Sequence, residues 1–193
     1  MSKGLIAIIA VVLLLGTYGC STYNGIVGKD VAVDNAWANV QTQYQRRADL
    51  IPNLVNTVKG AADFEKSTLT AVIEARAKAT SVQLSADELT PENMQKFQQA
   101  QDQLSGTLSR LLVAVERYPE LKANQNFLEL QAQLEGTENR IAVARKDFND
   151  VVKDYNLSVR TFPANIFAGI FGFAVKGFFE ASQAAQTAPT VQF

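Results

Sequence analysis

The residues of this sequence that could do acid–base chemistry are carboxylates, because the chain has no histidine and a single cysteine, Cys20. Two carboxylates can hydrolyse a glycoside when a fold holds them facing each other. Acidic side chains in periodic segments include Asp49, Glu65, Glu74, Glu135 and Glu138. They are spread along the chain, without a phosphate-binding glycine loop or a nucleophile elbow. The sequence therefore predicts no enzymatic activity, no cofactor, no metal site and no small-molecule substrate.

Size and charge narrow the class of protein further. The chain has 193 residues with 18 Lys and Arg against 19 Asp and Glu, a net charge of -1. A nucleic-acid-binding protein would normally show a basic excess, so no nucleic-acid partner is expected. The length fits one domain of ordinary size plus an attachment.

The attachment is an uncharged N-terminal stretch. Residues 4–28 contain no Asp, Glu, Lys or Arg, and as a helix they would span roughly 37 Å, enough for a hydrocarbon layer of ~30 Å. Lys3 flanks one side, whereas Lys29 and Asp30 cancel on the other, which places the N-terminus in the cytoplasm and the rest outside a bacterial cell membrane. Residues 1–28 are thus predicted to be a single-pass membrane anchor. Its aliphatic centre comprises Leu5, Ile6, Ile8, Ile9, Val11, Val12, Leu13, Leu14 and Leu15.

Two other interpretations of this stretch stay open. Gly19 before Cys20 resembles a lipoprotein cleavage site, with Cys20 as the candidate lipidation site, although Thr17 stands where leucine is usual and Tyr18 is bulky. A buried helix is the third interpretation. A retained anchor and a lipoprotein both tether the protein to a membrane.

The rest of the chain has helical periodicity. Apolar residues recur every three or four positions in four stripes, and no strand-like alternation competes with them. Residues 29–161 are therefore predicted to be an all-α, antiparallel up-and-down four-helix bundle with long helices. The stripes cover residues 33–51, 51–72, 94–118 and 127–155.

Some helix boundaries are readable from the sequence. Thr90 before a proline looks like an N-cap. Asn126 with Glu129 resembles a capping pair, and a start of the fourth helix a few residues earlier is the alternative. The junction of the first two helices has two interpretations. Either a new helix begins near Pro52, or Pro52 lies within one long helix that breaks near Gly60.

A phenylalanine-rich segment, residues 162–182, follows the predicted bundle. Four helices would return the chain to the membrane-proximal end, so we expect this segment to lie in the lipid interface. Packing against the bundle or another subunit, and a re-entrant hairpin, are the alternatives. Residues 183–193 are predicted to be a flexible tail. The proposed interface or oligomer contacts are Phe162, Phe167, Phe171, Phe173, Phe178 and Phe179.

Five charged residues fall where the stripes call for apolar ones: Arg47, Glu65, Arg76, Glu138 and Arg145. A buried charge is tolerated when it is paired and hydrogen-bonded. One hypothesis is a polar layer across the bundle, with Glu138 paired to Arg47 or Arg76. The alternative is that these side chains lie at the stripe edges and extend to water.

Several motifs resemble the bacterial LemA family, over about residues 22 to 180. The resemblance implies a membrane-anchored protein with an exported helical bundle and no attached enzymatic activity. One relative belongs to the magnetosome membrane, which implies a part in membrane organisation. Cys20 departs from the apolar run usual in relatives. The motifs are RRADLIPNLV at residues 46–55, TVKG at 57–60, RYPELKAN at 117–124 and EGTENRIA at 135–142.

These features favour a membrane-tethered scaffold that associates with copies of itself at the bacterial cell envelope. The anchor and the phenylalanine-rich segment would make two contacts with one bilayer, and two tethers hold a surface more persistently than one. The alternative function is an exported adaptor that binds an envelope protease, a transporter or another membrane partner.

Overall fold

The computed structural model describes residues 3–60 and 64–180, and in these ranges every regular element is helical. This agrees with the predicted all-α class. The predicted tail, residues 183–193, lies outside the described residues, as do residues 181 and 182 of the phenylalanine-rich segment. The elements are α1 (Lys3–Lys59), α2 (Lys66–Ser81), the 3-10 turn η1 (Ala86–Glu88), α3 (Pro91–Val115), α4 (Pro119–Lys122), α5 (Gln125–Arg160) and α6 (Ala164–Phe171).

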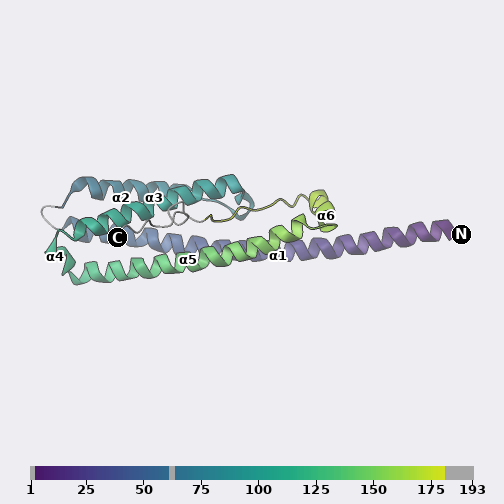
Figure 1. The fold of residues 1–193 in the computed structure, drawn as a ribbon, viewed down its shortest axis with the longest axis horizontal. Helices are drawn as coiled ribbons and strands as arrows, with labels where there is room; N and C mark the ends of the chain where they lie inside the picture. Colours follow the sequence, from purple (N-terminus) through teal and green to yellow (C-terminus); the bar gives the residue numbers. More distant parts are fainter. Residues whose placement is uncertain (1–2, 61–63, 181–193) are drawn as a thin grey trace, which may run out of the picture.

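One uninterrupted helix, α1, joins the apolar N-terminal stretch to the rest of the protein (Figure 1). Its 57 residues include Pro52, so the break near Gly60 is correct and a new helix beginning near Pro52 is wrong. Proline cannot donate a hydrogen bond to the carbonyl four residues earlier. That carbonyl belongs to Ala48, and it accepts a hydrogen bond from Arg76 Nε of α2 at 2.8 Å. The Ala48 carbonyl is thus hydrogen-bonded by a residue outside α1.

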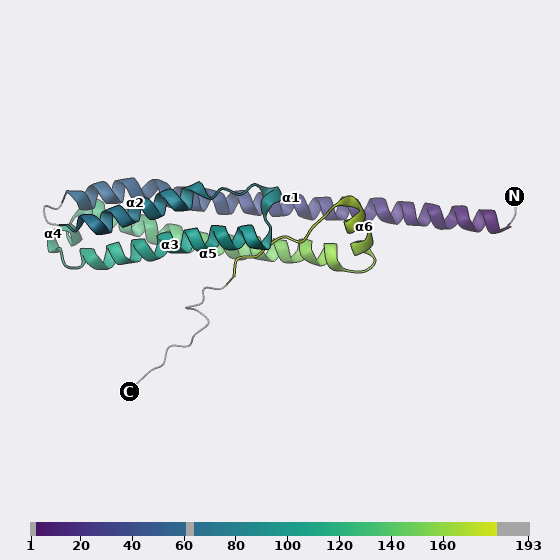
Figure 2. The ribbon, with the colours of Figure 1, turned by 90° about the horizontal axis from the view of Figure 1, so that it is seen from above.

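The long helices lie lengthwise beside one another. Helix α1 packs along α5, α2 packs along α3, and the N-terminal part of α1 projects alone beyond the others (Figures 1 and 2). By length and composition, this projecting part is apolar enough to cross a membrane. The protein therefore has a helical body and one exposed apolar extension.

The helix starts follow local capping rules. The side chain of Thr90 accepts a hydrogen bond from the Asn93 amide at 3.3 Å, as predicted for the N-cap of α3. Helix α5 begins at the earlier of the two alternatives, because Asn124 rather than Asn126 is the N-cap. Asn124 has the extended backbone that an N-cap needs and accepts the Phe127 amide at 3.2 Å, whereas Asn126 already lies inside the helix.

Buried side chains form two cores along the helical body. The aromatic core lies on the side of the projecting part of α1 and contains Trp37, whose indole nitrogen donates to the Leu84 carbonyl at 2.9 Å. The aliphatic core lies at the far end. Members of the aromatic core include Trp37, Tyr44, Phe97, Phe148, Tyr155 and Phe179. Members of the aliphatic core include Ile51, Leu54, Val58, Val72, Leu104, Leu111 and Leu134.

The chain beyond α5 has two parts. Helix α6 ends at Gly172, whose φ of 79° is a left-handed conformation that glycine adopts without strain. Residues 172–180, which we call the strap, then run back along the helical body without regular structure (Figure 2). The phenylalanine-rich segment is therefore a short helix followed by an extended return.

Candidate functional site

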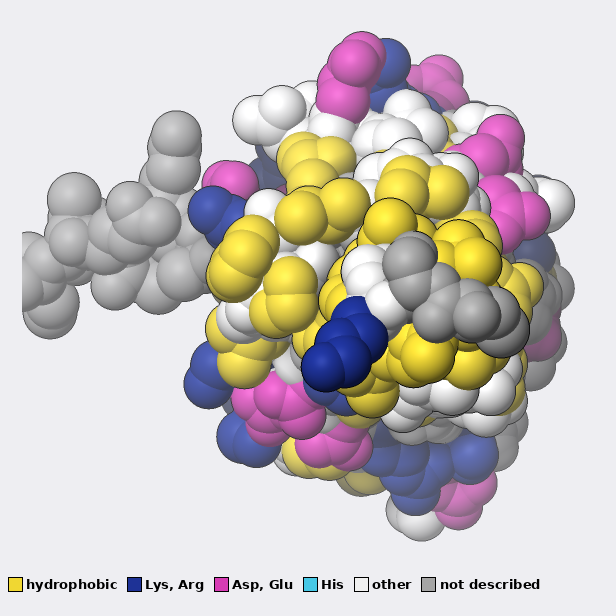
Figure 3. Space-filling model, turned by 90° about the vertical axis from the view of Figure 1, so that its right-hand side faces the viewer, with side chains coloured by type: hydrophobic (Ala, Val, Ile, Leu, Met, Phe, Trp, Pro, Cys, Tyr) yellow, Lys and Arg dark blue, Asp and Glu magenta, His cyan; other side chains and the backbone are white. Residues whose placement is uncertain are grey.

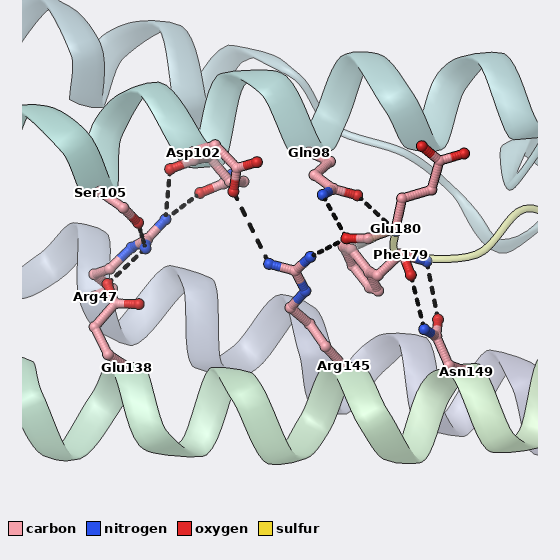
Figure 4. Close-up of polar contacts among 10 residues, drawn as sticks. Arg47, Gln98, Asp102, Ser105, Glu138, Arg145, Asn149, Phe179 and Glu180 are labelled. Carbon is pink, nitrogen blue, oxygen red and sulfur yellow. Dashed lines mark hydrogen bonds and ion pairs between the residues drawn. The ribbon is translucent and has the colours of Figure 1, made fainter. Parts of the chain in front are cut away.

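Between the two cores lies a polar cluster centred on Arg47, whose side chain is 1% exposed. Its Nη1 donates to Glu138 Oε1 and to Ser105 Oγ, each at 2.6 Å, and its Nη2 donates to Gln101 Oε1 at 2.7 Å (Figure 4). Gln101 Nε2 in turn donates to the Ala79 carbonyl of α2 at 3.1 Å. All four long helices thus contribute to one polar layer.

The other charged residues of the stripes lie elsewhere. Arg76 satisfies the Ala48 carbonyl and does not pair with Glu138. Glu65 is exposed just before α2 and accepts a hydrogen bond from Ser67 Oγ at 2.6 Å. The predicted layer therefore contains Arg47 and Glu138, without Arg76 or Glu65.

Arg145, the remaining charged residue of the stripes, lies beside the strap. One of its nitrogens lies 3.9 Å from Asp102 Oδ1, and another donates to the Glu180 carbonyl at 3.2 Å (Figure 4). Its guanidinium carbon lies 4.7 Å from the centre of the Phe179 ring, a cation–π arrangement. A single side chain of α5 therefore contacts α3 and the end of the strap.

Three side-chain amides hold the backbone of the strap. The amide of Asn156 both accepts from the Lys176 amide and donates to the Lys176 carbonyl, each at 2.8 Å. Asn149 makes the same pair of bonds to Phe179 at 2.9 Å, and Gln98 does so to Glu180 at 2.8 and 3.0 Å. Each amide thus pairs with the strap much as a neighbouring β-strand would. We call Asn149, Asn156 and Gln98 the amide clamp.

The strap also buries one aromatic ring. Phe179 is 5% exposed, and its ring centre lies 5.5 Å from that of Phe148, 6.2 Å from Trp37 and 6.3 Å from Phe97. Its predicted place in the lipid interface is therefore wrong, because the strap carries this ring back into the aromatic core. Phe178, the preceding residue, remains partly exposed.

A charged contact fixes the middle of the strap. Lys176 Nζ lies 2.7 Å from Asp30 Oδ1 and 3.6 Å from Asp34 Oδ1 of α1, and it donates to the Ala86 carbonyl at 3.2 Å. Beside it, the Tyr155 hydroxyl donates to the Ala174 carbonyl at 3.0 Å. Burial, reinforced by the carboxylates of Asp30 and Asp34, raises the pKa of Tyr155 to about 12.

The phenylalanines of α6 and of the start of the strap lie beside the projecting part of α1. The Phe167 ring lies against Tyr18, with a centre distance of 5.6 Å, and Phe171 and Phe173 lie 4.9 and 5.7 Å from Tyr23. Phe162 is 81% exposed. In Figure 3, hydrophobic side chains gather on this end of the molecule around the projecting helix.

Sequence reasoning missed the amide clamp and the destination of the strap. One sequence feature could have indicated the clamp: Asn149 and Asn156 are seven residues apart and so lie on one face of α5. Their spacing does not identify the strap as their partner. Among the described residues, no group of three or more Cys, Asp or Glu is arranged to hold a metal ion.

The chain matches the model of one protein family. The model of a family described as the LemA family matches residues 36–193, which include the helical body, α6 and the strap. No curated protein matches the chain.

Proposed function

The chain belongs to the LemA family, and from that premise we propose that it is a non-enzymatic, membrane-anchored protein that associates with copies of itself. In this role it organises the membrane of the bacterial cell envelope. The observation that carries the proposal is the docking of α6 on α1 at the outer end of the apolar stretch.

The position of this contact suits a lipid interface. About twenty residues of helix cross a hydrocarbon layer of ~30 Å, so an anchor that starts near Gly4 would end near Tyr23. Helix α6 contacts α1 at Tyr18, Gly19 and Tyr23, and it leaves Ile166 and Ile170 exposed. Aromatic rings are favoured at this depth. The anchor and α6 would then touch the same bilayer.

The contact at Gly19 supports a retained anchor over a cleaved lipoprotein. A Cβ added at Gly19 would lie 2.8 Å from Phe167 Cε1, so this glycine makes room for the ring. Cleavage before Cys20, which is exposed, would remove Tyr18 and Gly19 and leave Phe167 without these contacts. With the anchor retained, Lys3 on its N-terminal flank favours a cytoplasmic N-terminus, with the body on the extracytoplasmic side and one membrane crossing.

The same proposal treats α1, α2, α3 and α5 as an antiparallel four-helix bundle. Its support is the pairing of α1 with α5 and of α2 with α3. An even number of long helices returns the chain to the side on which it entered, and α6 lies on that side (Figure 1). The bundle would project from the membrane and present its length to neighbouring copies.

Lipid contact by α6 can be tested with a tryptophan placed on its exposed face. We expect emission from Ile170→Trp in vesicles to be quenched by brominated lipids, above the background that Trp37 gives in the unsubstituted chain. Val113→Trp is the matched control, because Val113 is equally exposed but lies on α3. Equal quenching in the two variants would contradict the proposed contact of α6 with the membrane.

Self-association is tested by crosslinking the full chain in native membranes and sizing the products. Crosslinked copies of the chain are expected. A single foreign partner without self-products would instead support the adaptor function. That alternative is favoured by a groove of about 930 Å³ along α1, whose lining includes Gln41, Gln45 and Gln101.

A further inference from the structure

The strap is held mainly through its backbone, which any extended peptide can offer. The amide clamp supplies six hydrogen bonds to main-chain atoms of Lys176, Phe179 and Glu180. Tyr155 and Arg145 donate two more, to the carbonyls of Ala174 and Glu180. The groove between α3 and α5 therefore has the properties of a site for an extended peptide, in which main-chain bonds supply affinity.

Three positions make this groove selective. The carboxylates of Asp30 and Asp34 receive the lysine ammonium of position 176. At position 177 a Cβ would lie 2.8 Å from Pro91 Cα, so only glycine fits, and the Gly177 amide donates to the Leu89 carbonyl at 2.7 Å. The aromatic core receives the ring of position 179. The preferred ligand is thus an extended peptide that reads Lys-Gly-any-Phe.

The covalent connection of the strap permits exchange. The strap begins at the left-handed Gly172, directly after the short helix α6. Residues 161–163, which are not helical, connect α6 to α5. Exchanging an identical segment between copies preserves the groove contacts and is a low-cost route to association. Copies anchored in one membrane also meet at high effective concentration.

We propose that this groove also accepts residues 172–180 of a neighbouring copy, so that anchored copies are joined by exchanged straps. The inference rests on the proposed self-association and gives it a specific interface. The occupant is a second copy because the chain itself carries the Lys-Gly-any-Phe sequence that the groove selects.

The experiment uses charge reversal in full-length chains reconstituted in vesicles. One variant is Lys176→Glu, which alters the strap, and the other is Asp30→Lys/Asp34→Asn, which alters the groove. In the first variant a carboxylate of the strap faces Asp30 and Asp34, and in the second variant Lys176 faces another lysine. In each variant alone, like charges therefore repel and the strap should leave the groove. Trp37 is the only tryptophan and lies beside Phe179, so its emission should shift to longer wavelength. Lys153→Glu, a charge reversal at an exposed site of α5, is the control that should leave emission unchanged.

Mixing the two variants in equal amounts restores matching charges only between different copies. We expect the mixture to regain the emission of the unsubstituted chain, and crosslinking to yield pairs with one copy of each variant. A spectrum equal to the mean of the two separate spectra would overturn the exchange. Unchanged emission in both single variants would also overturn it, because the ion pair would then not select the occupant.

Two further arms separate this proposal from its alternatives. If the unsubstituted chain forms oligomers but the mixture does not recover, the exchange is wrong while the proposed function stands; a monomeric unsubstituted chain contradicts both. A synthetic peptide of residues 172–180 is added to Lys176→Glu, whose groove is intact. Recovery with the peptide but not in the mixture would assign the groove to a free peptide ligand and overturn the neighbouring copy as occupant.

Discussion

The two cores of the helical body are completed in different ways. In the aliphatic core, side chains such as Leu54, Val72 and Leu111 come from long helices that follow one another in the chain. In the aromatic core, Phe179 arrives from the strap and lies against Trp37 of α1, 142 positions earlier in the sequence. Apart from Phe64, which precedes α2, the aliphatic core is built from helix residues, whereas the aromatic core also needs the strap, a segment without periodicity.

This difference predicts that the two ends open separately. The strap is held by side-chain hydrogen bonds worth about 0.5–1.5 kcal/mol each and by one buried ring, and it can leave without breaking a helix. The helices of the aliphatic core cannot separate without unfolding much of the body. Local opening is therefore expected in the aromatic core, at the end of the body beside the projecting part of α1, where we propose the exchange.

The largest effect is expected in the aliphatic core. Leu111 is fully buried, so Leu111→Ala should lower the free energy of unfolding by about 2–5 kcal/mol through lost burial and a residual cavity. Urea unfolding followed by circular dichroism measures this. Native Trp37 emission should not change, because Trp37 belongs to the other core. Val113→Ala, at a site that is 70% exposed, should change stability by less than about 0.5 kcal/mol. A red-shifted native emission in Leu111→Ala would contradict the independence of the two cores.

A smaller loss is expected in the polar layer between the cores. Glu138→Gln leaves the buried Arg47 guanidinium without its carboxylate, and we expect a loss of about 1–3 kcal/mol because Glu138 is 43% exposed. A double-mutant cycle with Arg47→Met should give a coupling of at least about 1 kcal/mol.

The exposed pair Lys146 and Asp150 is the control for that cycle. Its nitrogen and oxygen are 2.7 Å apart, but both side chains are largely in water, so its coupling should be no more than about 0.5 kcal/mol. Equal coupling in the two pairs would show that the burial of Arg47 does not strengthen its pairing with Glu138.

The sequence predicted the parts of the fold that local rules determine. The stripes identify the helical class, Thr90 marks the start of α3, and Arg47–Glu138 is one of the two pairs that the polar-layer hypothesis gave for Glu138. The helix through Pro52 was one of two alternatives, and it is stabilised by Arg76, a residue 24 positions away. Such a contact is invisible to a local pattern.

The strap shows why the remainder was not predictable. After Gly172 the segment has no helical periodicity, and its hydrophobicity fits a lipid interface as well as a protein core. The positions of Asn149, Asn156 and Gln98 on two helices, together with the other groups that bond the strap, decide that its backbone is held by protein. The sequence shows that Phe179 is apolar, but it does not show whether this ring lies in lipid or in the protein core.

A single methyl group at Gly177 should separate the strap from the helices. Gly177→Ala places a Cβ 2.8 Å from Pro91 Cα, and such overpacking costs about 1–3 kcal/mol where the backbone cannot move. We expect red-shifted Trp37 emission and faster hydrogen exchange at Lys176 and Phe179, with the helix content unchanged. Gly136→Ala is the matched control, because a Cβ there meets nothing within 4 Å. It should stabilise α5 by up to about 1 kcal/mol, and the same strap opening in both variants would contradict the steric argument.

The smallest expected effect is a loss of strap stability in alkaline solution through Tyr155. The neutral phenol donates to the Ala174 carbonyl, and its pKa of about 12 lies above the ordinary value of 10.0 because of burial and the nearby Asp30 and Asp34 carboxylates. Below about pH 10 both folded and unfolded phenols are protonated, so the contribution of Tyr155 is complete. Between pH 10 and 12 the unfolded phenol ionises while the folded one does not, and stability falls. The difference in unfolding free energy between the unsubstituted chain and Tyr155→Phe should therefore shrink across this range, because every other group is the same in the two chains. If the difference in unfolding free energy stays constant from pH 9 to 12, the Tyr155 hydroxyl does not help to hold the strap.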